Sequence, residues 1–415
     1  MTYDVVKDEC YYRDIWFSRA FALFLNAVLI VDLFRKGLNN TNLTTFVQYA
    51  IYILLAIYVY YQIFIVNKMV ISKRFFSFVV LLITITFASY MVTNEISQSF
   101  SYFIPFLILR IIPGIYLCLS LTKNRATLVL SELNKYKIIW FIYALIGAVM
   151  ISIKTGYSNQ YSMTFGYNLL LPAAFILYEI TTKFKIRDIA FFLLFLGSIL
   201  ARGSRGSLFC LLIIGALVYI FIYLNDISNK KLIRIFLLLV IATALLLSYD
   251  TLLMSLSQLF PTSRTISMLS SGNITSEMGR SSIKELIIAG IKDNSVAFRG
   301  IFADRVFFGN AYGSNFDVTN HPHNIFYEMI YQFGVLGGSL IFVSLMASLI
   351  SNVRHFTALR NKELVFLWIY LFASGFAKLI LSSSYLLTVE FFMLMALSTN
   401  INGYFKMDCV EEEVQ

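Results

Sequence analysis

Long apolar runs recur along this chain from one end to the other, with short polar segments between them. A helix needs a run of about 20 apolar residues to cross a bilayer. About twelve runs reach or approach this length, with approximate bounds 15–34, 43–66, 75–92, 100–121, 136–153, 162–180, 188–202, 206–224, 232–250, 324–350, 364–384 and 385–403. We therefore predict an all-α integral membrane protein, a polytopic bundle of about twelve transmembrane helices, because no alternating pattern suggests a barrel.

The composition leads to the same class. Hydrophobic residues make up 59% of the 415 residues and charged residues 13%, and the mean hydropathy is +0.75. This leaves too little polar surface to coat a soluble globular protein. No internal repeat stands out, so residues 1–415 are predicted to form a single polytopic membrane domain.

The basic residues indicate the orientation of the bundle. The formal net charge is +10, and many lysines and arginines lie in alternate connections, at 68–74, 123–137, 183–187, 230–234 and 354–362. By the positive-inside rule these segments are cytoplasmic, as are both termini. The long connection 251–323 is then extracytoplasmic. The scatter of the basic residues along the chain argues against a nucleic-acid surface.

The connection 251–323 is the one long polar break in the sequence, and its apolar residues suggest that it packs on the membrane surface. Ile283, Leu286, Ile287 and Ile291 recur at helical spacing, which predicts a short interfacial helix after Arg280. A helix start with an adjacent guanidinium suits a phosphate. The alternative is that Arg280 holds its own loop through carbonyl hydrogen bonds.

Two further segments carry arginines at positions where a positive charge requires a partner or contact with water. Residues 202–207 read Arg-Gly-Ser-Arg-Gly-Ser in a tight outer turn, so Arg202 and Arg205 break the positive-inside pattern and imply an anionic partner. A lipid headgroup or a helix-capping role is the alternative. Arg110 lies near the middle of an apolar run, where a charge normally faces a partner or a wet cavity.

The segment His321-Pro322-His323-Asn324 holds two of the three histidines. Pro322 suits the start of a helix, so His323 and Asn324 are expected on its first turn. There His323 would share a face with Tyr327, and Asn324 with Glu328. Imidazole transfers protons near neutral pH, and a helix start at the outer interface lies within reach of water and of a membrane-bound substrate.

Two other interpretations of the histidines remain. They could cap the helix or line an interface. A His-x-His pair could also bind zinc, although no third cluster of ligands stands nearby and Asp304 and Asp317 are isolated in the sequence. A metal is therefore not expected.

Together these motifs resemble the O-antigen polymerases and O-antigen ligases of bacterial surface-glycan assembly. The resemblance rests on Ser-Arg-Gly at 204–206, Gly-Arg at 279–280, Phe-Gly-Asn-Ala-Tyr-Gly at 308–313, His-Pro-His-Asn-Ile-Phe-Tyr-Glu at 321–328 and Phe-Gly-Val-Leu-Gly-Gly at 333–338. It covers residues 190–350 in detail. The histidine motif followed by Gly-x-x-Gly is the most specific part.

The resemblance implies a GT-C-like membrane glycosyltransferase at the outer face of the bacterial inner membrane. The donor would be an undecaprenyl-diphosphate-linked oligosaccharide, with no metal or cofactor. Arg205 and Arg280 are expected to bind the donor diphosphate, and Arg202 and Arg110 are further candidates. His323 is the expected general base and His321 its partner, with Asn324, Tyr327 and Glu328 in support.

Three functions fit this resemblance or the helix number. A polymerase adds repeat units to another lipid-linked unit, and it is favoured here. A ligase transfers the glycan to lipid A core. A flippase for the same lipid-linked oligosaccharide is the rival of another class, although paired Gly/Pro breaks and internal symmetry are not visible. Membrane lipids and a chain-length regulator protein are the other expected partners.

Overall fold

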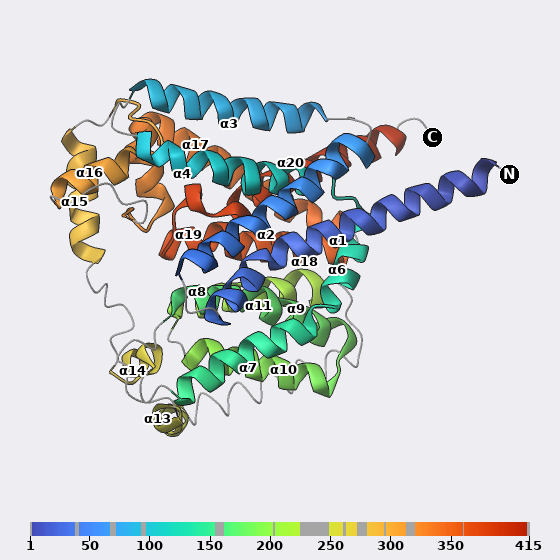
Figure 1. Cartoon of the computed structure of the whole chain (residues 1–415), viewed down its shortest axis with the longest axis horizontal. Helices are drawn as coiled ribbons and strands as arrows, with labels where there is room; N and C mark the ends of the chain where they lie inside the picture. Colours follow the sequence, from blue (N-terminus) through green and yellow to red (C-terminus); the bar gives the residue numbers. More distant parts are fainter. Residues whose placement is uncertain are drawn as a thin grey trace. The chain divides into compact units, whose positions relative to one another are not determined.

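The structure is a computed structural model. It describes residues 2–37, 41–66, 72–92, 97–153, 162–201, 204–224, 249–259, 263–271, 280–293, 296–312, 320–359 and 361–412. Within these ranges the regular structure is helical and no strand occurs (Figure 1). The predicted all-α class is confirmed.

In the described part of the chain, eight helices are long and apolar enough to cross a membrane. They are Tyr11–Arg35, Thr45–Ile65, Lys73–Val92, Phe100–Leu119, Met163–Lys183, Arg205–Tyr223, Ile325–Phe356 and Lys362–Leu381. Two shorter apolar helices, Lys137–Gly147 and Val389–Ile401, match two more predicted spans. A multi-pass membrane protein is therefore supported. The predicted span 232–250 lies almost entirely outside the described residues, and a total of twelve and a GT-C-like arrangement stay predictions.

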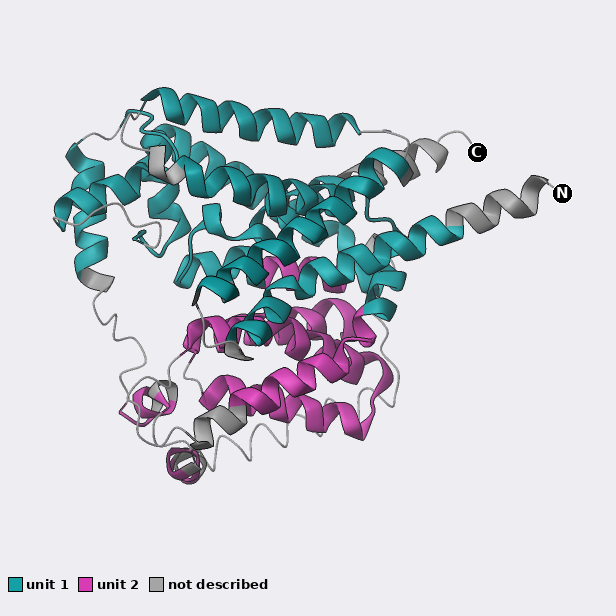
Figure 2. Ribbon diagram, in the orientation of Figure 1, with its two compact units in different colours: residues 1–132, 277–364, 374–415 teal, residues 133–276, 365–373 magenta. Residues whose placement is uncertain are grey.

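The chain divides into two compact units, coloured separately in Figure 2. Unit 1 comprises residues 1–132, 277–364 and 374–415, and unit 2 comprises 133–276 and 365–373. Each unit is described by itself, and the single polytopic domain stays a prediction. The helices of unit 1 are α1 (Thr2–Gly37), α2 (Thr41–Tyr61), α3 (Lys73–Val92), α4 (Ser97–Phe106), α5 (Ile112–Leu119), α6 (Lys123–Asn134, to residue 132), α15 (Arg280–Asp293), α16 (Ala303–Ala311), α17 (Ile325–Leu359), α19 (Lys378–Leu381) and α20 (Val389–Glu412), with short turns Gln62–Val66, Leu107–Ile111 and Tyr385–Leu387.

Close packing of α5 on α20 forms the centre of unit 1. A Cβ atom on Gly114 would lie 2.9 Å from Met393 Cγ, so only glycine permits this approach. Asn400 of α20 donates hydrogen bonds to the carbonyls of Cys118 and Leu121, at 3.1 and 2.9 Å. These bonds tie the end of α5, and Leu121 just beyond it, to α20. Small residues and interhelical hydrogen bonds are what membrane helices use to associate.

Helix α17 is interrupted and consists of two helices, so the apolar segment predicted at 324–350 is not one continuous helix. Gly334 has φ 73° and ψ 165°, which interrupts the helix. The carbonyl of Gln332 accepts hydrogen bonds from the backbone N–H groups of Arg299 and Gly300, at 2.9 and 3.1 Å. A Cβ on Gly338 would lie 2.7 Å from Ile330 Cα, so the second helix turns back against the first. The first helix, residues 325–333, is about 13 Å long and cannot cross a bilayer.

The glycines at 334 and 338 therefore have a structural explanation. Gly334 reverses the chain, and Gly338 lies at the close contact between the two helices of this hairpin. Irregular backbone at membrane depth is tolerated only when protein surrounds it or when it lines a cavity. The paired N–H groups at 299 and 300 meet that requirement.

Unit 2 contains α7 (Lys137–Ile153), α8 (Met163–Asn168), α9 (Leu170–Lys183), α10 (Ile186–Ala201), α11 (Arg205–Val218) with the turn Tyr219–Tyr223, α13 (Tyr249–Leu259) and α14 (Arg264–Ser270), together with most of α18 (Lys362–Phe372). Lys137 of α7 lies 3.4 Å from Glu179 of α9 and 3.8 Å from Asp188 of α10. Trp140 of α7 packs edge-on against Phe175 of α9, at 5.5 Å between ring centroids. This ion-pair network and the aromatic contact join three helices of the unit.

In its described residues, the long connection predicted at 251–323 contains all or part of four helices, α13, α14, α15 and α16. The predicted helix after Arg280 is confirmed as α15. Its apolar face packs against protein, because Ile287 lies fully buried in one cluster with Phe308 of α16 and Tyr331 of α17. The side chains that suggested a membrane-surface helix are therefore used to dock α15 on the helical hairpin.

Candidate functional site

The two histidines lie against each other immediately before α17. Their ring centroids are 4.2 Å apart at an interplanar angle of 54°. His321 is 8% exposed, and His323 is half-buried with φ 55°. Left-handed backbone is uncommon for a residue with a side chain, although histidine adopts it more often than most. The surrounding structure must hold this conformation in place.

Helix α17 begins at Ile325, so His323 and Asn324 are not on its first turn as predicted. Asn324 is instead the residue that caps the helix. Its Oδ1 accepts hydrogen bonds from the N–H groups of Phe326 and Tyr327, at 3.0 and 3.4 Å, and its Nδ2 donates to the carbonyl of Ile380 at 3.3 Å. Because His323 is outside the helix, the predicted shared face with Tyr327 does not exist. The Asn324 cap fixes the helix start directly after the histidine pair.

A fully buried arginine joins α16 to the first turn of α17. Arg305 Nη1 contacts Asp304 and also Glu328 Oε1, the latter at 2.6 Å, and Nη2 contacts Ser384. The Ser384 hydroxyl donates to the same Glu328 oxygen at 2.5 Å. All four side chains are 0% exposed. We call these residues, together with Gln332 and Tyr385, the Arg305 cluster.

Gln332, one helical turn after Glu328, completes the cluster. Its Nε2 donates to Asp304 Oδ1 at 2.7 Å, and its Oε1 accepts from the Tyr385 hydroxyl at 2.5 Å. Burial raises the pKa of Tyr385 well above its usual value, and Glu328 and Asp304 add to the effect, so the phenol remains a hydrogen-bond donor. Burial alone would lower the pKa of Arg305, but Asp304 and Glu328 raise it above its usual value. The cation is therefore permanent.

The cluster ties the helix that follows the histidines to two distant parts of the sequence. Asp304 and Arg305 come from α16, whereas Ser384 and Tyr385 come from the segment between α19 and α20. Buried charges are tolerated when paired and hydrogen-bonded in this way. The predicted supporting residue Glu328 is thus a structural partner of Arg305, and Asp304 is not isolated.

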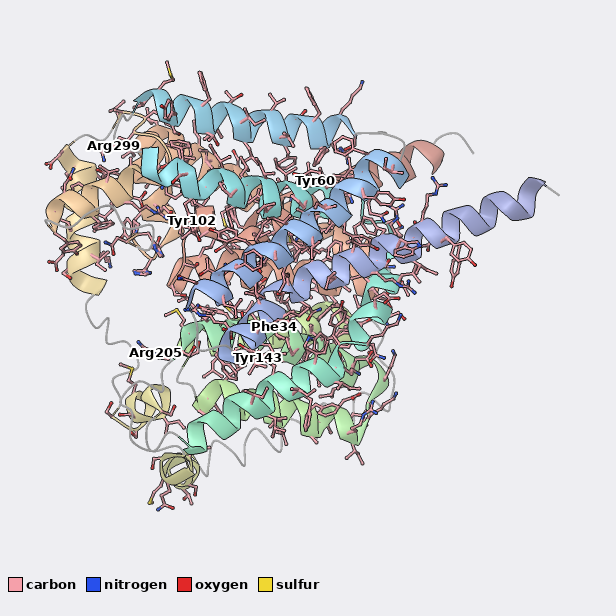
Figure 3. All side chains as sticks on the ribbon, in the orientation of Figure 1. Phe34, Tyr60, Tyr102, Tyr143, Arg205 and Arg299 are labelled. Carbon is pink, nitrogen blue, oxygen red and sulfur yellow. The ribbon has the colours of Figure 1, made fainter. Side chains whose placement is uncertain are left out.

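Arg299 forms a second contact between the connection and α17. Its Nη2 donates to the carbonyl of Gly290 at 2.9 Å, and its guanidinium lies over the Tyr331 ring at 4.1 Å. Arg299 is labelled in Figure 3. Gly290 is in the last turn of α15, whose carbonyls need such donors. The predicted supporting residue Tyr327 packs against the apolar cluster that contains Ile287 and Tyr331.

In unit 2, Arg205 is the first residue of α11 and is half-buried (Figure 3). The turn before it is tightly held: Ser204 and Ser207 are fully buried, and a Cβ on Gly166 of α8 would lie 2.5 Å from Ser204 Cβ. Ser263 donates to the carbonyl of Leu200 at 2.6 Å, near the end of α10. Helix α8 thus packs closely against the residue that precedes Arg205.

Of the other three predicted arginines, the structure describes Arg280 and Arg110. Arg280 was predicted to precede the helix and is instead the first residue of α15; it belongs to unit 1 with the histidines. Arg202 lies outside the described residues. Arg110 lies in the π-helical turn Leu107–Ile111 between α4 and α5. Since Arg205 belongs to unit 2, its association with Arg280 and the histidines stays a prediction.

Sequence reasoning missed most of the Arg305 cluster. Two signals were present: an adjacent Asp-Arg pair at 304–305 and the spacing of Glu328 and Gln332, which puts two polar side chains on one face of an apolar helix. Ser384 gave no signal. Among the residues that the structure describes, no three His, Cys, Asp or Glu side chains gather as a metal site, and metal independence stays a prediction.

Comparison with known proteins agrees with the motifs. Residues 190–342 match the family model described as O-antigen ligase. No curated protein matches the chain, and no solved structure does. The matched range contains Arg205, Arg280, both histidines and the Arg305–Glu328 pair. Residues 190–342 are therefore similar to an O-antigen ligase domain, and the apolar helices of the described ranges support a multi-pass membrane protein.

Proposed function

We propose that the protein is an O-antigen polymerase of the bacterial inner membrane, with both termini in the cytoplasm and the reaction at the outer face. It joins oligosaccharide repeat units that are carried on undecaprenyl diphosphate. The observation that carries the proposal is the family match over residues 190–342, which includes every residue in the proposed mechanism except the supporting arginine Arg110. Outside the cell a donor must carry its own activation, and a lipid diphosphate does so.

The proposed reaction is a direct glycosyl transfer. A hydroxyl of the acceptor sugar attacks the anomeric carbon of the donor, and its proton passes to His323. The bond between the anomeric carbon and the phosphate oxygen breaks, and the electron pair leaves with undecaprenyl diphosphate. A general base of this kind contributes about 10²–10⁴ in rate. His321, in ring contact with His323, orients it or binds the sugar.

Arg205 and Arg280 are proposed to hold the donor diphosphate, with Arg202 as an alternative to Arg205. Two guanidinium groups can bind the diphosphate through paired hydrogen bonds and stabilise the charge that develops as it leaves. Asn324 supports the site by capping α17 directly after His323. Glu328 supports it through Arg305, and Tyr327 through the docking of α15, the helix that begins at Arg280.

Single alanine substitutions of Arg205, Arg280 and His323 test this assignment in a strain that depends on the protein for its polymer. Each should abolish polymer while normal amounts of protein remain in the membrane. His355→Ala and Arg187→Ala are matched controls, because they remove a histidine and an arginine outside the proposed site and should leave the polymer normal. Normal polymer from all three test variants would reject the assignment.

A reaction with purified protein separates polymerase from ligase. Lipid-linked repeat units supplied alone should yield a ladder of longer lipid-linked chains. If product forms only after lipid A core is added, the protein is a ligase. Movement of labelled lipid-linked oligosaccharide across a vesicle membrane without a new glycosidic bond would instead support a flippase.

A further inference from the structure

Arg110 is a cation in the middle of an apolar span that offers it no acidic partner. It lies within Phe100–Leu119, which is long and apolar enough to cross a membrane. Its guanidinium lies over the Tyr52 ring at 4.6 Å and near Phe106 at 5.7 Å, and Nη1 donates to the Tyr52 hydroxyl at 3.4 Å. Nε is buried and has no hydrogen-bond partner. No acidic side chain of the described ranges pairs with it, although a charge at this depth costs about 2.5–3.5 kcal/mol.

The backbone around Arg110 is arranged to present this side chain. Residues Leu107–Ile111 form a π-helical turn, which re-aims the side chains that it carries. Pro113 has no N–H to donate to a carbonyl of the preceding turn. The carbonyl of Ile108 instead accepts a hydrogen bond from the Tyr60 hydroxyl at 2.8 Å. Helix α2, which carries Tyr60 and Tyr52, is thus fixed against this turn.

Tyr102 is a second phenol near the guanidinium, besides Tyr52. Tyr102 interacts electrostatically with Arg110, Tyr52 and Tyr49. Tyr102 and Tyr49 are 46% and 43% exposed, so the group is accessible from the surface of unit 1 (Tyr102 and Tyr60 are labelled in Figure 3). A guanidinium and neighbouring hydroxyl donors are the groups that bind phosphate oxygens. A phosphate would also supply the missing negative charge.

The proposed polymerase reaction requires two lipid diphosphates at different distances from the base. The diphosphate of the donor is bonded to the reacting anomeric carbon, so it lies at the reaction centre. The diphosphate of the acceptor is separated from the attacking hydroxyl by a repeat unit and remains attached after the reaction. A polymerase therefore needs a second phosphate site away from the first, whereas a ligase has one polyprenyl diphosphate substrate.

Arg110 lies away from the histidine-bearing region, as this second phosphate site requires. Phe103 of α4 contacts Phe302, the residue before α16, at 5.3 Å between ring centroids. Arg110 follows Phe103 by seven residues, which is about 10 Å along the helix axis. Phe302 also lies 5.2 Å from the guanidinium of Arg305, which ties α16 to the start of α17.

We propose that Arg110, with Tyr52 and Tyr102, binds the diphosphate of the lipid-linked acceptor. This inference rests on the proposed polymerase function. It accounts for an intramembrane cation without an acid, for the phenols around it and for its distance from the contact between α4 and α16.

The test compares two acceptors with purified full-length protein in nanodiscs. One is the repeat unit on undecaprenyl diphosphate, and the other is the same oligosaccharide without lipid or phosphate. For the natural protein, kcat/KM should be higher with the lipid-linked acceptor. Arg110→Gln should lower this preference at least tenfold, mainly through the KM of the lipid-linked acceptor, whereas the control Arg187→Gln should keep it.

The other outcomes would overturn either this inference or the proposed function. An equal loss with both acceptors would overturn the inference, because it would show that Arg110 serves the fold or the donor; Arg110→Lys, which keeps the charge, checks for simple misfolding. An effect of Arg110→Gln that appears only in discs of anionic phospholipid, with the acceptor preference intact, would assign an ordinary lipid headgroup and also overturn it. If the natural protein extends neither acceptor, the proposed function itself fails.

Discussion

Two arginines of unit 1 satisfy their charge in opposite ways. Arg305 is fully buried and contacts two carboxylates and a serine hydroxyl. Arg110 is half-buried and has aromatic rings and one phenol as neighbours. A buried charge that the protein neutralises itself stabilises one arrangement of its helices. A charge that the protein leaves without a counter-charge is available to a ligand.

The balance of charge differs as well. The Arg305 cluster has one cation and two carboxyl groups, and Glu328 Oε2 is buried without a hydrogen-bond partner. The Arg110 site has a cation and no acid in the part of the chain that the structure describes. The two sites should therefore respond differently to substitution: the first in stability, the second in binding.

The largest effect is expected from Arg305→Met. The substitution leaves Asp304 and Glu328 buried without their cation, which typically costs 3–5 kcal/mol. Thermal unfolding of the purified protein in detergent should show a large loss of stability or a failure to accumulate folded protein. Arg305→Lys should recover part of the loss, because it restores the charge but not the forked geometry. An unchanged melting temperature for Arg305→Met would contradict the structural role.

The next effect is expected at Gly334, where α17 reverses. A Cβ there would lie 2.5 Å from the carbonyl oxygen of Val296, and φ is 73°. Gly334→Ala should cost about 2–3 kcal/mol in the same unfolding measurement. Gly337→Ala is the matched control, because its Cβ would lie 3.4 Å from Phe333 Cβ, an ordinary contact. Equal effects of the two substitutions would mean that α17 does not need its break.

These residues also show how far the sequence could lead. Helix lengths and the helix at 280–293 follow from apolar spacing, which is local information. The break in α17 was not predicted because Phe333-Gly334 continues an apolar run. The sequence does not reveal the positive φ of Gly334 or its close approach to the backbone of Val296. Glycine alone in such a run is compatible with a helix.

The candidate site likewise has one part that the sequence could predict and one part that it could not. The histidine pair could be predicted because both residues lie within three positions of each other. The Arg305 cluster could not, since Arg305 and Ser384 are 79 residues apart in sequence and serine is common in apolar helices. Chain reversals and tertiary packing, rather than spacing, bring such residues together.

A smaller effect is expected from Glu328→Gln. The amide oxygen can still accept from Arg305 and Ser384, while the unpartnered carboxylate oxygen Oε2 is replaced by an amide group and the cluster becomes a neutral pair. The cost should be about 1 kcal/mol. Asp304→Asn should cost more, about 1–3 kcal/mol, because both oxygens of Asp304 accept hydrogen bonds, from Arg305 and Gln332. The reverse order would show that Glu328 is the main counter-charge.

The smallest change in stability is expected from Arg110→Met, measured on lipid-free protein in a neutral detergent. The substitution removes an uncompensated charge and keeps an apolar stem against the Tyr52 ring, so the melting temperature should change little or rise slightly. The binding readout should move instead. Undecaprenyl diphosphate at about 100 times its Kd should stabilise a protein with a second site by a further 2.7 kcal/mol, and this increment should vanish in Arg110→Met. A large loss of stability without lipid would make Arg110 a structural residue like Arg305 and remove the distinction between the two.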